Sequence, residues 1–154
     1  MRTETAGVVA PPPLIFLTFL ACSLAIHRYY PWSSGLPGPL RQTVAVAMIA
    51  GGLTLVILAA RLFRGVGTAI RPWNPSTALV LTGPYRWTRN PMYVAMTLIY
   101  AAISLLVDSL WPILFLPALL QTMNWGVIQR EERYLEGLFG EEYRAYREQV
   151  RRWI

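Results

Sequence analysis

Four long stretches of the sequence contain no Asp, Glu, Lys or Arg. They are residues 5–26, 42–60, 90–107 and 109–129, with lengths of 22, 19, 18 and 21 residues. A helix rises about 1.5 Å per residue and the hydrocarbon core of a bilayer is about 30 Å thick, so about 20 apolar residues cross it. Each stretch is therefore long enough to cross a membrane as a helix.

A soluble bundle of buried helices is the alternative, and its helices would carry a polar residue at every third or fourth position. Residues 43–60 show no such polar stripe. Only 14% of the chain is charged, against about 25% in soluble domains. The sequence therefore predicts an all-α, polytopic membrane protein whose four transmembrane helices lie at about residues 8–28, 42–62, 91–107 and 109–129.

All 14 basic residues are arginines, and they are spread unevenly around the uncharged stretches. If the N-terminus is cytoplasmic, only Arg28 and Arg41 lie on the far side of the membrane. Positive charge gathers on the cytoplasmic side of membrane proteins, so this bias predicts a cytoplasmic-membrane protein with both termini inside. The net charge of +6 then reflects topology and attraction to anionic lipid, and nucleic acid is not an expected partner.

Two segments outside the predicted spans carry most of the polar residues. Residues 64–90 are rich in glycine and proline and too long for a turn, and long ordered loops are usually functional. Residues 130–154 are amphipathic, and Gly140 interrupts their pattern. We expect this tail to form two helices on the membrane surface, and the 154 residues to form a single membrane domain.

The predicted third and fourth spans are separated only by Asp108, which indicates a tight antiparallel hairpin. Asp108 is interpreted as a solvated turn residue. The hairpin would bring residues 89–93 and 131–132 to the same depth on adjacent helices. In the second span, the pair at residues 51–52 is Gly-Gly, which favours close approach of another helix.

Both segments that the hairpin joins have two interpretations. Asn90 and Pro91 suit the N-cap and first position of a helix, and this alone explains them. A helix start also has free amide donors that bind carboxylates. Glu131 and Glu132 form either a solvated face or a site for ligand hydroxyls or a ligand cation. With one histidine and one cysteine in the chain, no metal site is expected.

Three sequence motifs resemble one known family. They are LVLTGPYRWTRNPMY at residues 79–93, EERYL at 131–135 and FGEEYRAY at 139–146. Their order and spacing resemble the isoprenylcysteine carboxyl methyltransferase family, and phospholipid N-methyltransferases are similar in the same region. The resemblance covers about residues 65–154. It implies an integral membrane methyltransferase that uses S-adenosylmethionine without a Rossmann fold.

The resemblance also implies roles for individual residues. Arg89 would orient an anionic group of the acceptor, and Glu132 is a second catalytic candidate that competes with Glu131 for the cofactor. Asn90 replaces the histidine usual in the carboxyl methyltransferases, and Val127 stands where they carry an arginine, which leaves the acceptor open. The implied cofactor-binding residues are Thr77, Leu79, Val80, Tyr85, Asn90, Pro91, Met92, Tyr93 and Glu131.

The expected function is methyl transfer from S-adenosylmethionine to a lipophilic acceptor held in the bilayer. The accepting atom belongs to a carboxylate, an amine or a thiol. One alternative is a non-catalytic membrane scaffold that binds lipid through its arginine-rich tail. A related membrane reductase is another, but the short chain leaves little room for the added helices and nicotinamide site that it would need.

Overall fold

The structure is a computed structural model, and it describes residues 5–65, 67 and 76–154. Within these residues the chain forms helices and loops without β-strands, so the all-α prediction is confirmed. The elements in chain order are α1 (Pro12–Tyr29), α2 (Gly38–Gly65), the short 3-10 helix η1 (Gly83–Arg86), α3 (Pro91–Leu106), α4 (Trp111–Met123), a π-helical segment (Asn124–Ile128), α5 (Gln129–Phe139) and α6 (Glu141–Gln149).

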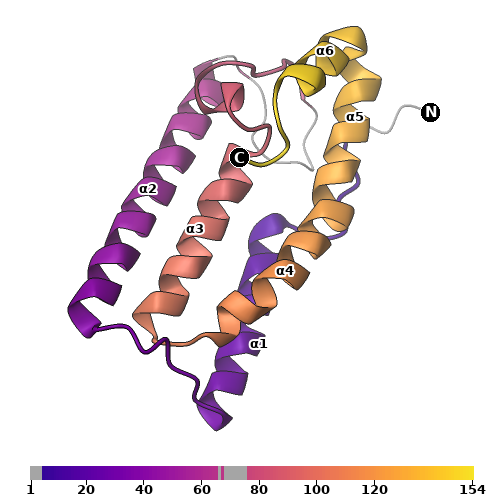
Figure 1. Cartoon of the computed structure of the whole chain (residues 1–154). Coiled ribbons are helices and arrows are strands. Elements are labelled where there is room, and N and C mark those ends of the chain that lie inside the picture. Colours follow the sequence, from indigo (N-terminus) through magenta and orange to yellow (C-terminus); the bar gives the residue numbers. More distant parts are fainter. Residues whose placement is uncertain (1–4, 66, 68–75) are drawn as a thin grey trace.

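The long helices run side by side, with α3 between α2 and the helix formed by α4 and α5 (Figure 1). The most extensive interhelical packing joins α2 to α3 and α1 to α4. The smaller α6 folds back over the end of the bundle where α3 begins (Figure 1). This end also contains η1 and the C-terminus.

Three of the described helices are long and apolar enough to cross a membrane: α1, α2 and the continuous helix Trp111–Phe139. Helix α3 is also apolar but has only 16 residues. The four predicted spans are therefore three long helices and one shorter helix. Large apolar side chains cover the outer helix surfaces, and Leu17 and Val46 are both more than 60% exposed. Such continuous apolar exposure marks an integral membrane protein.

Helix α2 packs on α3 through small residues. Its buried positions are Ala45, Gly52 and Ala59, whose seven-residue spacing places them on one face of the helix. A Cβ atom at Gly52 would lie 2.9 Å from the Ile99 side chain and 3.0 Å from the Ala95 carbonyl oxygen. The predicted close approach is confirmed at Gly52, because only a residue without a side chain fits there.

The amphipathic tail differs in part from its prediction. Helix α5 is not a separate helix, because the π-helical segment joins it to α4 without a break in the backbone hydrogen bonding. No proline or glycine stands between Ile128 and Glu136 to end the helix. The predicted break at Gly140 is confirmed: its φ of 55° suits glycine, and α6 begins at the next residue.

Asp108 lies at the turn between α3 and α4, as predicted, and its side chain is 37% exposed, but its carboxylate also has partners that the sequence did not indicate. One oxygen of its carboxylate lies 2.7 Å from Arg41 Nη1. The other oxygen accepts hydrogen bonds from the Ser34 hydroxyl at 2.7 Å and the Ser34 amide at 3.0 Å. Asp108 therefore ties the α3–α4 turn to Ser34 in the α1–α2 connection and to Arg41 near the start of α2.

Candidate functional site

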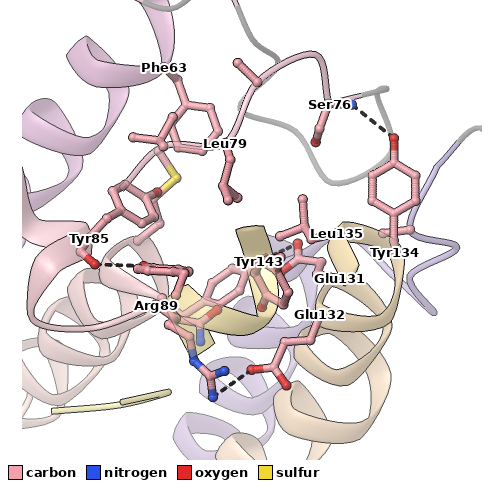
Figure 2. Close-up of a pocket in the computed structure, with 17 residues that line it drawn as sticks. Phe63, Ser76, Leu79, Tyr85, Arg89, Glu131, Glu132, Tyr134, Leu135 and Tyr143 are labelled. Carbon is pink, nitrogen blue, oxygen red and sulfur yellow. Dashed lines mark hydrogen bonds and ion pairs between the residues drawn. The ribbon is translucent and has the colours of Figure 1, made fainter. Parts of the chain in front are cut away.

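A pocket lies at the end of the bundle where α3 begins, between the loop before α3 and helices α5 and α6 (Figure 2). The space between its atoms, including the open mouth, is about 870 Å³. Of the eleven residues predicted for the site, all except Thr77 and Pro91 line this pocket. Pro91 is buried as the first residue of α3, and the Thr77 hydroxyl donates to the Gly67 carbonyl at 3.3 Å.

The predicted meeting of the two motif segments is confirmed at Tyr93 and Glu131. The Tyr93 hydroxyl on α3 donates a hydrogen bond to Glu131 Oε1 on α5, at 2.6 Å. Glu131 stands beyond the uncharged part of its helix, which ends at Gln129. Burial raises the pKa of Glu131 from 4.5 to about 7; the neighbouring Glu132 also raises it, and the Tyr93 hydrogen bond opposes both. A carboxyl group that changes its charge near pH 7 therefore lines the pocket.

Glu132 has different partners from its neighbour. It accepts two hydrogen bonds from Arg152, at 3.0 and 2.6 Å, and its Oε1 lies 3.2 Å from Arg89 Nη2. Figure 2 shows the Arg89 and Glu132 side chains pointing toward each other below the pocket. Glu132 therefore acts as a buried anchor for two arginines, and Glu131 is the carboxylate hydrogen-bonded across the pocket to α3.

Arg89 keeps unused hydrogen-bonding capacity. Its side chain is only 10% exposed, and its Nε and Nη1 atoms are buried without a hydrogen-bond partner among the residues described. Buried donors without partners are unfavourable, by about 1–3 kcal/mol each. An anionic group bound in the pocket would satisfy them with charge-assisted hydrogen bonds.

Tyrosines form much of the pocket wall. Tyr85 in η1 packs edge-on against Phe63, with ring centroids 5.6 Å apart, and its carbonyl accepts a 2.7 Å hydrogen bond from the Tyr146 hydroxyl. Burial raises the pKa of Tyr143 to about 12, so its hydroxyl is neutral at physiological pH. Tyr143 and Tyr146 were not predicted as site residues. Their i, i+3 spacing on α6, which places both on one face, was the available signal.

The loop before α3 is attached to the opposite wall. The Ser76 amide donates a 3.1 Å hydrogen bond to the Tyr134 hydroxyl on α5. Leu79 and Val80 follow in the same loop and line the pocket. Figure 2 shows the resulting cavity, with Phe63, Leu79 and Tyr85 on one side and Glu131, Tyr134 and Leu135 on the other.

The chain end braces the start of α3. We call residues 150–154 the C-terminal strap. The Arg152 carbonyl accepts hydrogen bonds from the Thr88 hydroxyl and the Asn90 side-chain amide, both at 3.0 Å. The Arg151 carbonyl accepts one from the Arg89 amide at 2.9 Å. Asn90 occupies the N-cap position as predicted, but its side chain binds the strap rather than capping α3 within the described chain, because the strap's carbonyl is within its reach.

Sequence reasoning also missed Arg152. All six tail arginines had been explained by topology and lipid attraction, and nothing in the local pattern separates Arg152 from Arg151. Val127, where the carboxyl methyltransferases carry an arginine, is fully buried in an apolar cluster.

Comparisons with known proteins agree with these motifs. The family described as phospholipid methyltransferase matches residues 40–142, which is more than half of the chain and includes Tyr93 and Glu131. A Haemophilus influenzae protein described as uncharacterized is 40% identical over 63 residues, which are 41% of this chain and 100% of that protein. No solved structure matches. The resemblance to integral membrane methyltransferases is thus confirmed, and the chain belongs to the phospholipid methyltransferase family.

Proposed function

We propose that this protein transfers a methyl group from S-adenosylmethionine to a lipophilic acceptor that enters from the bilayer. The family supplies the reaction class, methyl transfer. The observation that carries the proposal is the pocket at the end of the apolar helices, where Glu131, Tyr93 and Arg89 converge. At this position a polar cofactor could enter from the aqueous side and a lipid acceptor from the bilayer.

The pocket residues fit this cofactor chemically. The Glu131 carboxylate suits the ribose hydroxyls or a positive charge of the cofactor, and aromatic walls suit its adenine. The start of α3 at Asn90 and Met92 suits its carboxylate, since helix N-termini bind anions. We retain as the proposed cofactor-binding set Thr77, Leu79, Val80, Tyr85, Asn90, Pro91, Met92, Tyr93 and Glu131. In this set Pro91 acts by fixing the start of α3, and Thr77 by its place in the loop.

The cofactor supplies the activated methyl group, and the protein's own contribution is alignment. Tyr85 and Tyr93 both line the pocket, and the ring face of either would attract a cationic sulfur. The apolar side chains Val80, Met92 and Leu135 exclude water from the reacting atoms. In such a pocket the acceptor would attack the methyl group directly, in line with the bond to the cofactor sulfur, and the protein would not need a nucleophile of its own.

On the acceptor side we propose that Arg89 binds an anionic group through Nε and Nη1. Glu132 would act through Arg89, as a positioning residue that holds the guanidinium by the 3.2 Å ion pair. The accepting atom belongs to a carboxylate, an amine or a thiol. In this proposal Glu131 binds the cofactor and Glu132 positions Arg89.

We further propose that α3 is the fourth transmembrane helix and that the pocket opens to the cytoplasm. The 16 residues of α3 are shorter than the roughly 20 that span a bilayer. Its apolar neighbour α2 has 28 residues and packs along it, so α3 is supported within the protein. The arginines of α5, α6 and the strap would then contact anionic lipid headgroups.

The test is calorimetric titration of the detergent-purified protein with S-adenosylhomocysteine. We expect binding in the micromolar range, weakened on the order of tenfold or more by Glu131→Gln, because a hydrogen bond to a charged group contributes about 1.5–3 kcal/mol. Glu148→Gln, an exposed substitution of the same kind on α6, should leave the affinity unchanged. Absence of binding by folded protein, in lipid as well as detergent, would favour a non-catalytic lipid-binding scaffold.

A further inference from the structure

Arg152 makes more side-chain hydrogen bonds around the site than its position near the chain end would suggest. Its guanidinium donates twice to Glu132, at 3.0 and 2.6 Å, and once to Asn124 Oδ1, at 2.9 Å. Asn124 lies in the π-helical segment and Glu132 in α5, so Arg152 connects two positions eight residues apart on the same long helix.

The strap that carries Arg152 is held at several points. Thr88, Arg89 and Asn90, the three residues before α3, all hydrogen-bond to carbonyls of the strap. Trp153 packs against the main apolar cluster of the bundle. The strap lies beyond the family match, which ends at residue 142, so membership of the family does not account for these contacts.

We propose that Arg152 is a positioning residue of the cofactor pocket, which engages the Glu132 carboxylate in an ion pair so that Glu131 is the carboxylate left for the ligand and Arg89 keeps donors free. The proposal rests on the function proposed above. The strap does not line the pocket within the described chain, so Arg152 acts through Glu132 and not by touching the ligand.

The physical reason is a competition for one carboxylate. In the structure Arg152 takes the two strong hydrogen bonds of Glu132, and Arg89 is left with a single 3.2 Å contact. Without Arg152, Arg89 would be the remaining ion-pair partner of Glu132 among the described residues. A guanidinium and a carboxylate then favour a two-bond pair, which would draw the Arg89 donors away from the pocket.

Loss of Arg152 would also change the charge near Glu131. Among the described residues, the titratable groups that act on Glu131 are Tyr93 from α3, Tyr85 from η1, Tyr143 from α6 and its neighbour Glu132. Among these, Glu132 carries the negative charge, and Arg89 and Arg152 are its counter-charges. Removing one counter-charge makes ionisation of Glu131 harder.

The experiment is titration of the full-length protein with S-adenosylhomocysteine at several pH values between 5.5 and 8.5. In the wild type we expect affinity to fall as pH drops through about 7, the pKa of Glu131. Arg152→Gln should move this midpoint upward. A rise of about one pH unit lowers the ionised fraction at pH 7 from about one half to about one tenth, which is about a fivefold loss of affinity.

Three further variants separate positioning from folding. Arg151→Gln removes the same charge from the neighbouring, exposed position and should leave the midpoint unchanged. Arg152→Lys keeps the charge and should hold the midpoint near that of the wild type. The double variant Arg152→Gln, Glu132→Gln removes both members of the pair and should return the midpoint toward the wild-type value.

An Arg152→Gln curve identical to that of Arg151→Gln would overturn the inference. So would a lower melting temperature in Arg152→Gln with an unchanged midpoint, because that result describes a purely structural contact. Failure of the proposed function would look different: the wild type itself would bind no S-adenosylhomocysteine at any pH.

Discussion

At the scale of single residues, Glu131 and Glu132 are neighbours in the chain with separate surroundings. Successive residues on a helix point about 100° apart, so one carboxylate reaches Tyr93 on α3 and the other reaches Arg89 and Arg152. Glu131, which has no arginine partner in the part of the chain that the structure describes, is the acid whose pKa is raised to about 7. The two carboxyl groups differ because their side chains point toward different parts of the folded chain. The sequence Glu-Glu alone does not reveal this difference.

The raised pKa of Glu131 predicts pH-dependent cofactor binding. Below about pH 7 the carboxyl is protonated and loses the charge that accepts hydrogen bonds from a ligand. Affinity for S-adenosylhomocysteine should therefore be highest above pH 7. Below pH 7 it should decrease, and the decrease should approach about tenfold for each pH unit. Calorimetry in matched buffers measures this. In Glu131→Gln the affinity should be low and flat over the same range; a persisting slope would assign the titration to another group.

At the scale of helices, the contact of α2 with α3 depends on a strip of small residues, Ala45, Gly52 and Ala59. This contact places the start of α3 beside η1 and therefore sets one side of the pocket. In a bilayer, lipid chains are as apolar as the side chains, so close backbone packing provides much of the association between helices.

We predict that Gly52→Ala destabilises the protein and that Gly51→Ala does not. The new methyl group at residue 52 would meet the Ala95 carbonyl oxygen at 3.0 Å, and a backbone atom cannot move aside without shifting α3. Overpacking of this kind costs about 1–3 kcal/mol. At residue 51 a Cβ atom meets open space. Thermal unfolding of both variants in detergent tests this, and equal melting temperatures would contradict the packing described.

The helices were predictable where their boundaries have a local cause. Uncharged stretches indicated α1 to α4, the Asn90–Pro91 pair marked the start of α3, and Gly140 marked the break before α6. The π-helical joint between α4 and α5 was not predictable, because the change from apolar to charged residues at Gln129 alters the surroundings of a helix without ending it. The pairing of Asp108 with Arg41 depends on the α3–α4 turn meeting the start of α2, which no local pattern encodes.

At the scale of the whole molecule, the segment that precedes α1 and the C-terminal strap both lie at the end of the bundle that holds the pocket. Near the N-terminus, the Gly7 carbonyl accepts a 3.0 Å hydrogen bond from Arg130, and the Val9 amide donates to the Gly126 carbonyl at 3.0 Å. At the other terminus, the strap holds Glu132 and the start of α3. The pocket is therefore built from residues that are far apart in the sequence.

The candidate site was partly predictable at this scale. The hairpin argument brought Tyr93 and Glu131 together because it needed only the direction of two helices and their shared turn. The contributions of Tyr143, Tyr146 and Arg152 depend on α6 folding back at Gly140. Their direction after that turn is set by tertiary packing, so the sequence alone marked the tail as amphipathic and basic and no more.

The most direct test of the central claim is photolabelling of the purified protein with methyl-tritiated S-adenosylmethionine under ultraviolet light, followed by peptide mapping. We predict that the label lies in residues 76–93 or 131–146, that excess S-adenosylhomocysteine prevents labelling, and that Glu131→Gln greatly reduces it. Label on α1 or on residues 38–58 of α2, which lie away from the pocket, or label that S-adenosylhomocysteine does not displace, would contradict a cofactor site in this pocket.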